Sequence, residues 1–462
     1  MIRILREILP SNVLLLAFTE AVIVLACFLL AAFLLLPVDP VVYLLYDGGL
    51  ARILIAVASI IVALYFHDLY TQITVRSRIL LLQQILQVIG ISFVFQALLF
   101  YASSELILPR WMMMLGGGMT LVAVNGWRLF YSSVVLQALG AERILFVGCN
   151  ALVEQIVRHI AANPNLGLSA VGYLDVQPNP GVEGLFPYLG RVDRLRELAE
   201  EQRPDRIIVG LTERRGQIPL ADLLDLRFSG IRIQEAAAAY EEVSKTISLK
   251  ELRPSQLIYM GGLGPRPGMV ALQVAYSKLI ALVGLVVTSP LMLLIAAAVK
   301  LTSPGPVFYR QTRVGWRGRH FTLYKFRSMR ADAEAATGAV WATKDDPRVT
   351  PVGRWLRRLR LDELPQFFNV LRGEMSLVGP RPERPEFVAS LAQQIPYYRQ
   401  RLAVRPGITG WAQINHEYGD SVEDAARKLE YDLYYIKNLS PALDAYIILQ
   451  TLKTVLLQRG AQ

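Results

Sequence analysis

An apolar run near the N-terminus limits what this chain can become. Residues 13–36 read VLLLAFTEAVIVLACFLLAAFLLL, and Glu20 is the one charged side chain among them. A helix of this length and composition is able to cross the hydrocarbon core of a bilayer. Over all 462 residues, 53% are hydrophobic and only 19% are charged, which is too apolar for an ordinary soluble protein. The sequence therefore predicts an integral membrane protein.

Three further apolar segments follow, at about 50–66, 79–101 and 112–136. Four membrane crossings place the chain before the first span and the chain after the fourth span on the same side of the membrane. Arg3, Arg6, Arg76, Arg78 and Arg143 fall on that side, and Arg52 and Arg110 fall on the other. Because positive loops stay inside, we expect both flanks in the cytoplasm. Within the first span, Glu20 has two interpretations: a functional group, or a polar contact between helices.

A different pattern begins at Arg143. Short apolar runs (RILFVGCN, LSAVGYLDV, DRIIVGL and GIRIQ) alternate with helical stretches such as residues 151–162. This alternation predicts a parallel α/β domain over residues 141–252. Its first turn, Val147 to Leu152, lies where a dinucleotide-binding fold has its phosphate loop, but it lacks the three-glycine spacing. We therefore expect a structural or regulatory role for this domain and no catalysis.

A second membrane segment has a break at its centre. Residues 279–299 are apolar, Lys278 and Lys300 flank them, and Ser289-Pro290 lies at the middle. Proline removes a backbone donor, and Ser289 can bond the carbonyl that is freed. The run alone is compatible with a kinked helix that spans the bilayer. The paired lysines are compatible with a helix that enters, bends at Pro290 and returns to the same face.

A basic hairpin is predicted next, with strands in 306–315 and 320–329 around a turn at 316–318. Lys325 and Arg327 are two residues apart, so we expect them on one face, where they could hold a pyrophosphate. A solvated or lipid-facing charged hairpin is the alternative. The alanine-rich stretch 331–343 is expected to be a loop, either closing over substrate or serving as a linker.

The chemistry centres on adjacent carboxylates, Asp362 and Glu363. Arg354, Arg357, Arg358 and Arg360 precede them, and Gly379-Pro380-Arg381-Pro382 follows. Asp362 is predicted as the N-cap of a short helix that has Pro365 in its first turn and ends before Gly373. At such a position a carboxylate stays ionised, and amid arginines it can attack a phosphoryl group or hold a divalent metal. An ordinary helix start with paired charges is the structural alternative.

Three strings resemble one family. LDELPQFFNVLRGEMSLVGPRPE at 361–383, KFRSM at 325–329 and RPGITGWAQIN at 405–415 are similar to the bacterial sugar transferases, the monotopic phosphoglycosyl transferases. The resemblance covers roughly residues 270–462. It implies that a sugar 1-phosphate moves from a UDP-sugar to undecaprenyl phosphate, that UMP is released, and that Mg²⁺ is the cofactor. It also implies a role in exopolysaccharide biosynthesis and favours the re-entrant reading of Ser289-Pro290.

By this resemblance Asp362 is the nucleophile, and Asp362 and Glu363 are the metal ligands. The expected substrate and phosphate contacts are Lys325, Arg327, Arg357, Arg381, Pro382 and Arg405. The predicted architecture is a four-span bundle at 1–140, a degenerate nucleotide-fold-like domain at 141–252, and an α+β catalytic domain at 265–462. The catalytic domain includes a re-entrant helix at about 275–301.

The expected location is the bacterial cytoplasmic membrane, with the catalytic domain on the cytoplasmic face. Membrane lipid is an expected partner, nucleic acid is not despite the net charge of +10, and homo-oligomerisation is left open. Two other functions are considered. A membrane-bound nucleotide-sugar dehydratase or epimerase would need a glycine-rich loop and a Tyr-x-x-x-Lys pair, which the sequence lacks. A non-catalytic scaffold for polysaccharide assembly would not need the intact carboxylate pair.

Overall fold

The computed structural model describes most of the chain. The described residues are 11–36, 39–70, 75, 77–103, 108–135, 140–182, 184–211, 218–249, 264–330, 333, 348–416 and 421–457. They fall into two compact units, Met1–Gln234 and Glu235–Gln462. The loop predicted at 331–343 lies, apart from Ala333, outside the described residues.

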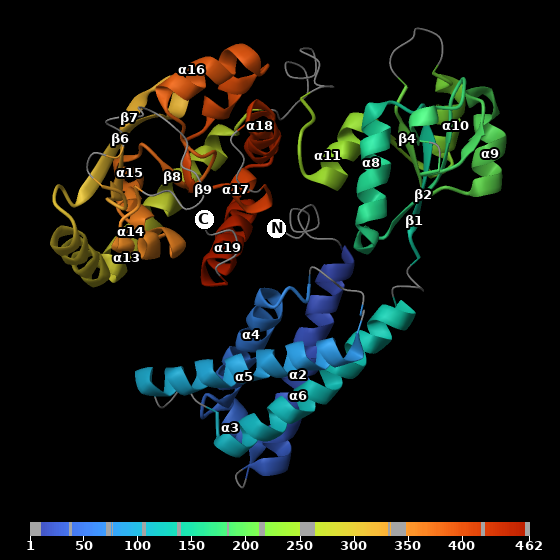
Figure 1. The fold of residues 1–462 in the computed structure, drawn as a ribbon. Helices are drawn as coiled ribbons and strands as arrows, with labels where there is room; N and C mark the ends of the chain where they lie inside the picture. The colour runs from blue at the N-terminus through green and yellow to red at the C-terminus, as the bar shows by residue number, and fades with distance from the viewer. Residues whose placement is uncertain are drawn as a thin grey trace. The chain divides into compact units, whose positions relative to one another are not determined.

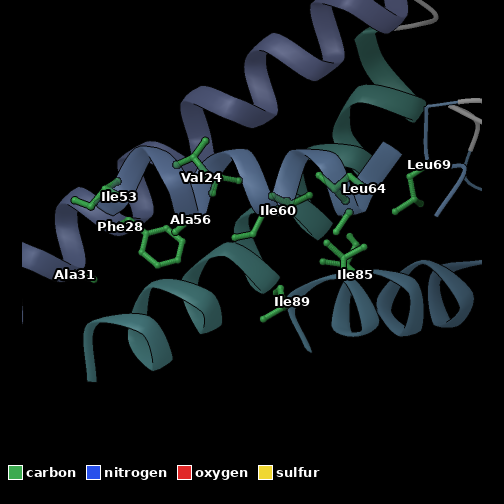
Figure 2. Close-up of a cluster of buried hydrophobic side chains, with 14 of the residues drawn as sticks. Val24, Phe28, Ala31, Ile53, Ala56, Ile60, Leu64, Leu69, Ile85 and Ile89 are labelled. Carbon is green, nitrogen blue, oxygen red and sulfur yellow. The ribbon is translucent and has the colours of Figure 1, made fainter. Parts of the chain in front are cut away.

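The first unit opens with a helical bundle (Figure 1). Its helices are α2 (Ser11–Leu35), α3 (Pro40–Leu45), α4 (Gly49–Phe66), α5 (Arg78–Ala102) and α6 (Arg110–Phe130), and α6 continues as a π-turn to Val135. Figure 2 shows part of the apolar core, where Phe28, Ile53, Ile60 and Ile89 are among the buried side chains. The bundle predicted from the apolar runs is thereby confirmed.

Among the described residues, four helices are long and apolar enough to cross a membrane: Asn12–Leu35, Gly49–Phe66, Arg78–Leu99 and Pro267–Thr302. The segment predicted at 112–136 does form a helix, α6, but it is less apolar than these four. Three consecutive glycines from Gly116 and the polar Asn125 and Arg128 lower its hydropathy. Two of the glycines have a packing role, because a Cβ atom on Gly116 or Gly117 would meet Phe28 or Phe93.

Glu20 forms a contact between helices, the second of the two interpretations given above. Its carboxylate Oε1 lies 2.6 Å from Arg128 Nε, and both side chains are buried. Arg128 also donates to the carbonyl oxygen of Leu69 at 2.8 Å, and its guanidinium lies 5.3 Å from the ring centroid of Tyr70. The two buried charges Glu20 and Arg128 are therefore partners of each other.

The α/β part contains β1 (Glu142–Val147), α8 (Ala151–Ala162), β2 (Leu168–Leu174), β3 (Tyr188–Gly190), α9 (Leu195–Gln202), β4 (Arg206–Val209), α10 (Leu220–Phe228) and β5 (Arg232–Glu235). The strand order is β3-β2-β1-β4-β5, and β1 pairs in parallel with both β2 and β4. This order matches the first five strands of the doubly wound dinucleotide-binding fold, 3-2-1-4-5-6. The predicted parallel α/β domain is confirmed.

Neighbouring residues of the same domain pack against the turn after β1 and bind its backbone. Gly148 has φ +85°, and a Cβ atom there would lie 2.7 Å from the backbone nitrogen of Leu211. The amide of Cys149 donates to Asp175 Oδ2 at 2.8 Å, and the side chain of Asn150 caps α8. Asp175 follows β2, at the position where a dinucleotide-binding fold has the acid that binds the ribose. In this protein the carboxylate of Asp175 instead accepts a hydrogen bond from the turn after β1.

The second unit begins with α11 (Ala236–Ser244), which packs on α18 (Val422–Lys437). Lys437 Nζ lies 2.6 Å from Glu241 Oε2, and Trp411 Nε1 donates to the carbonyl oxygen of Lys245 at 2.9 Å. Residues 236–249, which the sequence pattern places with the α/β domain, thus pack within the second unit.

The long helix α13 (Pro267–Thr302) carries Pro290 in its interior. Pro290 cannot donate to the carbonyl oxygen of Val286, and Ser289 Oγ donates to that oxygen instead at 2.8 Å. This is the compensation predicted for the Ser-Pro pair. Whether α13 spans or re-enters stays a prediction.

The second unit also contains a hairpin and a short parallel strand pair (Figure 1). The hairpin consists of β6 (Phe308–Val314) and β7 (His320–Phe326), antiparallel as predicted, joined through a turn at Trp316–Gly318. After it come α14 (Pro351–Arg358), α15 (Gln366–Arg372), β8 (Ser376–Val378), α16 (Pro385–Gln394), β9 (Gly407–Thr409), α17 (Trp411–Asn415), α18 and α19 (Pro441–Leu456). Strands β8 and β9 pair in parallel.

Candidate active site

The carboxylate pair lies in a sharp turn between α14 and α15. Arg360 has a left-handed backbone, with φ 52°, and Leu361–Glu363 then form a 3₁₀ turn. Because this turn already has helical dihedrals, Asp362 is not an N-cap, and Pro365 takes that position ahead of α15. The predicted N-cap is therefore wrong, whereas the predicted helix end is confirmed by Gly373 at φ 79°.

Glu363 is the neutralised member of the pair. Its Oε1 accepts from Lys325 Nζ at 2.7 Å and from an Arg381 guanidinium nitrogen at 3.0 Å. Burial disfavours the ionised form, but the charges of Lys325 and Arg381 outweigh it and hold the pKa of Glu363 below its usual range. This carboxylate is ionised and fixed in place by two cations.

Asp362 has the opposite environment. Its side chain is only 7% exposed, and within the described part of the chain it makes no hydrogen bond or ion pair. Burial raises its pKa above the ordinary value, and the negative charge of Glu363 adds to this, while Lys325 and Arg357 act against it. Asp362 is not an N-cap, so a helix N-terminus is not what sets its ionisation. Its ionisation depends on the surrounding cations.

The other predicted phosphate ligands differ in how close they lie to this pair. Arg357 Nε donates to Ser328 Oγ at 3.0 Å, and its charge reaches Asp362. Arg327 is 4% exposed and donates to the carbonyl oxygens of Ser303 and Pro304 at 2.8 and 2.9 Å. Arg327 thus holds the end of α13 in place, and these hydrogen bonds are with Ser303 and Pro304, not with the carboxylate pair. Strand β7 ends at Phe326, so strand alternation does not extend to position 327.

Arg405 and Pro382 contact neighbouring segments of the same domain. Arg405 Nε donates to the carbonyl oxygen of Gly373 at 2.9 Å, and its guanidinium lies 4.7 Å from the ring centroid of Trp316. The carbonyl oxygen of Pro382 accepts from Arg313 at 3.0 Å. The structure shows contacts of these two residues with the protein itself.

A buried group that the sequence analysis missed holds the Arg381 loop. Arg401 donates to the carbonyl oxygen of Arg381 at 2.9 Å, to Asp432 Oδ2 at 3.1 Å and to Tyr398 Oη at 2.7 Å. On the other side of the loop, Tyr435 donates to the carbonyl oxygen of Val378 at 3.2 Å. These partners come from distant parts of the chain, so no local pattern marks them.

The donor set is compatible with magnesium. Among the described residues there is no group of three or more His, Cys, Asp or Glu side chains suited to a metal. Mg²⁺, however, is usually held by one or two carboxylates together with substrate phosphates and water. Asp362 is a buried carboxylate whose oxygens have no hydrogen-bond partner among the described residues, and Glu363 binds both of its cations through Oε1. The pair therefore fits a cation that arrives with a phosphorylated substrate.

Comparisons with known proteins match this arrangement. The family model "Bacterial sugar transferase" matches residues 268–458. A UDP-glucose:undecaprenyl-phosphate glucose-1-phosphate transferase of Xanthomonas campestris pv. campestris is 36% identical over 355 residues, which is 75% of this chain and 73% of that protein. The chain belongs to the bacterial sugar transferase family. The resemblance found in the three strings is thereby confirmed, and with it the prediction that this sugar transferase is a phosphoglycosyl transferase.

Two other relatives match this sugar transferase over a shorter length. A UDP-N-acetylgalactosamine-undecaprenyl-phosphate N-acetylgalactosaminephosphotransferase of Aeromonas hydrophila is 46% identical over 222 residues, 48% of this chain and 52% of that protein. A UDP-glucose:undecaprenyl-phosphate glucose-1-phosphate transferase of Escherichia coli (strain K12) is 49% identical over 169 residues, 36% of each chain. A model described as "CoA-binding domain" matches residues 65–218, which include the α/β sheet up to β4. With its apolar helices, the chain is a membrane protein.

Proposed function

We propose that this sugar transferase moves a sugar 1-phosphate from a UDP-sugar to undecaprenyl phosphate and starts the assembly of a lipid-linked polysaccharide. The relatives are named for this reaction with glucose and N-acetylgalactosamine. The observation that carries the proposal is the asymmetry of the pair. Glu363 is neutralised by two cations, and the adjacent Asp362 is a buried carboxylate left without a hydrogen bond among the described residues.

Asp362 is the nucleophile in this proposal. Its carboxylate oxygen forms a bond to the phosphorus next to the sugar, and the bond from that phosphorus to the bridging oxygen breaks, so that UMP leaves. An oxygen of the lipid phosphate then bonds to the same phosphorus, and the acyl phosphate bond breaks. The Asp362 carboxylate is restored, and the product is the lipid diphosphate sugar.

The surrounding side chains place and neutralise charge. Lys325 and Arg381 fix Glu363, and in this proposal their positive charges also face the pyrophosphate as it approaches Asp362. Arg357 adds a positive charge that favours ionised Asp362. Asp362 and Glu363 would hold Mg²⁺, which when bound would neutralise charge on the pyrophosphate and the leaving UMP.

We place the reaction at the cytoplasmic face of the bacterial cytoplasmic membrane. The support is chemical: UDP-sugars are cytosolic, and Lys278 and Lys300 at the two ends of the apolar part of α13 favour an anionic inner leaflet. A re-entrant α13 keeps Asp362 on that side.

Asp362→Asn tests the assignment. This variant keeps the shape of the side chain and removes the attacking charge, so UMP release from UDP-glucose and UDP-N-acetylgalactosamine should fall at least about 1,000-fold. Mass spectrometry of the parent protein incubated with UDP-sugar alone should show a sugar phosphate on the peptide that contains Asp362. Near-normal UMP release by a variant of unchanged thermal stability would contradict the assignment, and would also reopen the scaffold alternative for the pair.

A further inference from the structure

A cavity of about 120 Å³ adjoins the carboxylate pair and is not used by the mechanism above. Its walls come from the turn around Glu363, from α15, from β9, from α17 and from α19. The apolar side chains in these walls are Leu364, Phe367, Ile408, Ile414 and Val455.

The hydroxyl groups in the lining are already engaged. Thr451 Oγ1 donates to the carbonyl oxygen of Ile447 at 2.8 Å, and Thr454 Oγ1 donates to that of Gln450 at 2.9 Å. Thr409 and Thr451 share a hydrogen bond of 2.6 Å. An occupant therefore meets mostly methyl groups and apolar side chains.

Gln413 is the polar exception. Its Nε2 donates to the carbonyl oxygen of Ile408 at 3.2 Å, and its Oε1 is a buried atom without a partner among the described residues. One acceptor can bind one hydroxyl group. A sugar ring carries several hydroxyl groups, and an apolar cavity would leave most of them without hydrogen bonds.

Arg360 supplies a cation to the same cavity. Its left-handed backbone, φ 52°, is a strained conformation for a residue with a Cβ atom, and such strain gathers at functional sites. Its guanidinium makes no hydrogen bond or ion pair with the described residues, although its charge acts on Glu363. Arg327, Arg357 and Arg381 each donate to protein groups, so Arg360 keeps its donors for a ligand.

One wall of the cavity rests on the membrane helix. A Cβ atom on Gly284 of α13 would lie 3.0 Å from the ring of Phe367, so Phe367 packs against α13 where that helix has no side chain. Apolar residues of α13 beside this point are half exposed, Leu282 at 50% and Val283 at 54%. A hydrocarbon chain leaving the cavity along α13 would stay in contact with apolar surface.

We infer that this cavity binds the acceptor lipid: its phosphate on Arg360 and its first isoprenoid units against Phe367, Ile408 and Val455. The inference rests on the proposed function and names the subsite that it requires. An anionic head beside an apolar tail is the chemistry that a free guanidinium at an apolar cavity recognises.

Arg360→Gln tests the phosphate contact, with Arg358→Gln on α14 as the matched control. Assays use the full-length protein in nanodiscs with UDP-glucose or UDP-N-acetylgalactosamine. Loss of a charge-assisted contact should raise the KM for undecaprenyl phosphate about tenfold or more, with the KM for the UDP-sugar within about twofold. The control should leave both within about twofold. An unchanged KM for undecaprenyl phosphate in folded Arg360→Gln would overturn the phosphate site.

Val455→Phe tests the apolar part by filling the cavity, and Leu452→Phe is its control because Leu452 is 49% exposed on the same helix. Filling should weaken the use of undecaprenyl phosphate, and the control should not. If instead the KM for the UDP-sugar rises, or the preference between the two sugars changes, the cavity is a sugar subsite and the inference is wrong.

A binding measurement separates this inference from the proposed function. A photoreactive benzophenone derivative of farnesyl phosphate should label peptides that contain Phe367 or Val455, and undecaprenyl phosphate should compete whereas UDP-sugars and farnesol should not. Labelling there without turnover of any UDP-sugar would keep the lipid site and contradict the proposed reaction. Labelling confined to peptides outside the cavity lining would overturn the lipid site.

Discussion

Two buried charge clusters in this protein have similar composition but differ in whether every charged group has a partner. In the helical bundle, Glu20 and Arg128 neutralise each other, Arg128 also donates to the carbonyl oxygen of Leu69, and its guanidinium lies over the ring of Tyr70. In the second unit, Lys325 and Arg381 both bind Glu363, and the neighbouring Asp362 is left without a hydrogen bond among the described residues. The first cluster is complete in the sense that each charge has an opposite charge beside it, although Glu20 Oε1, Arg128 Nε and Tyr70 Oη are buried without a hydrogen bond among the described residues. The second cluster is incomplete, because Asp362 has no ion-pair partner among the described residues.

The largest expected effect comes from disturbing the incomplete cluster. Glu363→Gln removes the charge that holds Lys325 and Arg381, so turnover should fall roughly 100-fold or more, and activity should require more magnesium. The measurement is UMP release against magnesium concentration. A magnesium titration that matches the parent protein would place the cation elsewhere.

Disturbing the complete cluster, Glu20 and Arg128, should lower stability and leave turnover nearly unchanged. Arg128→Met leaves Glu20 buried without its partner and should lower the free energy of unfolding by about 3–5 kcal/mol, with little change in turnover per folded molecule. The double variant Glu20→Leu with Arg128→Met should recover most of the lost stability, because neither charge remains. Thermal unfolding in detergent, paired with UMP release, checks both. A double variant no more stable than the single one would show that the pair is needed for the fold itself.

A third test concerns where the catalytic unit begins. A protein that starts at Glu235 keeps the contacts of α11 with α18, whereas one that starts at Leu263 loses the partners of Trp411 Nε1 and Lys437 Nζ. We expect both to bind lipid, and the shorter one to be less stable by roughly 1–3 kcal/mol because the buried indole of Trp411 is left unpaired. Equal thermal stability of the two would make α11 dispensable to the second unit.

The smallest expected effect is a difference in pH dependence within the incomplete cluster, measured with EDTA present. The folded pKa of Asp362 is raised, so ionised Asp362 disfavours folding above the ordinary pKa of an aspartate, about 3.9. Asp362→Asn should therefore raise the Tm at pH 7, and the gain should shrink as pH falls towards that value. The folded pKa of Glu363 is lowered, so its contribution is present above about 4.3 and is lost as pH falls. Glu363→Gln should accordingly lower the Tm at pH 7, and Tm shifts of one sign for both variants would contradict the asymmetry.

The sequence correctly predicted the features that depend on residues close together in the chain. Helix α8 has the predicted bounds, 151–162. The hairpin forms as expected, and Ser289 bonds the carbonyl that Pro290 leaves free. These features depend on residues within a few positions of one another.

Predictions failed where the deciding partner is remote or where a regular element ends early. Arg128 is 108 residues from Glu20, so the sequence could not name it as the partner. Arg327 was paired with Lys325 by strand alternation, but β7 stops one residue before it. The left-handed Arg360 starts a 3₁₀ turn where the sequence indicated an N-cap. The carboxylate pair could be found from its residues and neighbours, but which of the two carboxylates binds Lys325 and Arg381 required the packed structure.

The contacts that hold the Arg381 loop have a consequence for how this enzyme can vary. Arg401 and Tyr435 bind the carbonyl oxygens of Arg381 and Val378, and Arg313 binds that of Pro382. Every residue type offers the same carbonyl group, so the path of the loop is insensitive to which side chain stands at position 381. A histidine or lysine placed there would be delivered to the same spot beside Glu363. The backbone of the loop is therefore held independently of its side chains, so the residue at position 381 can change while the loop keeps its conformation.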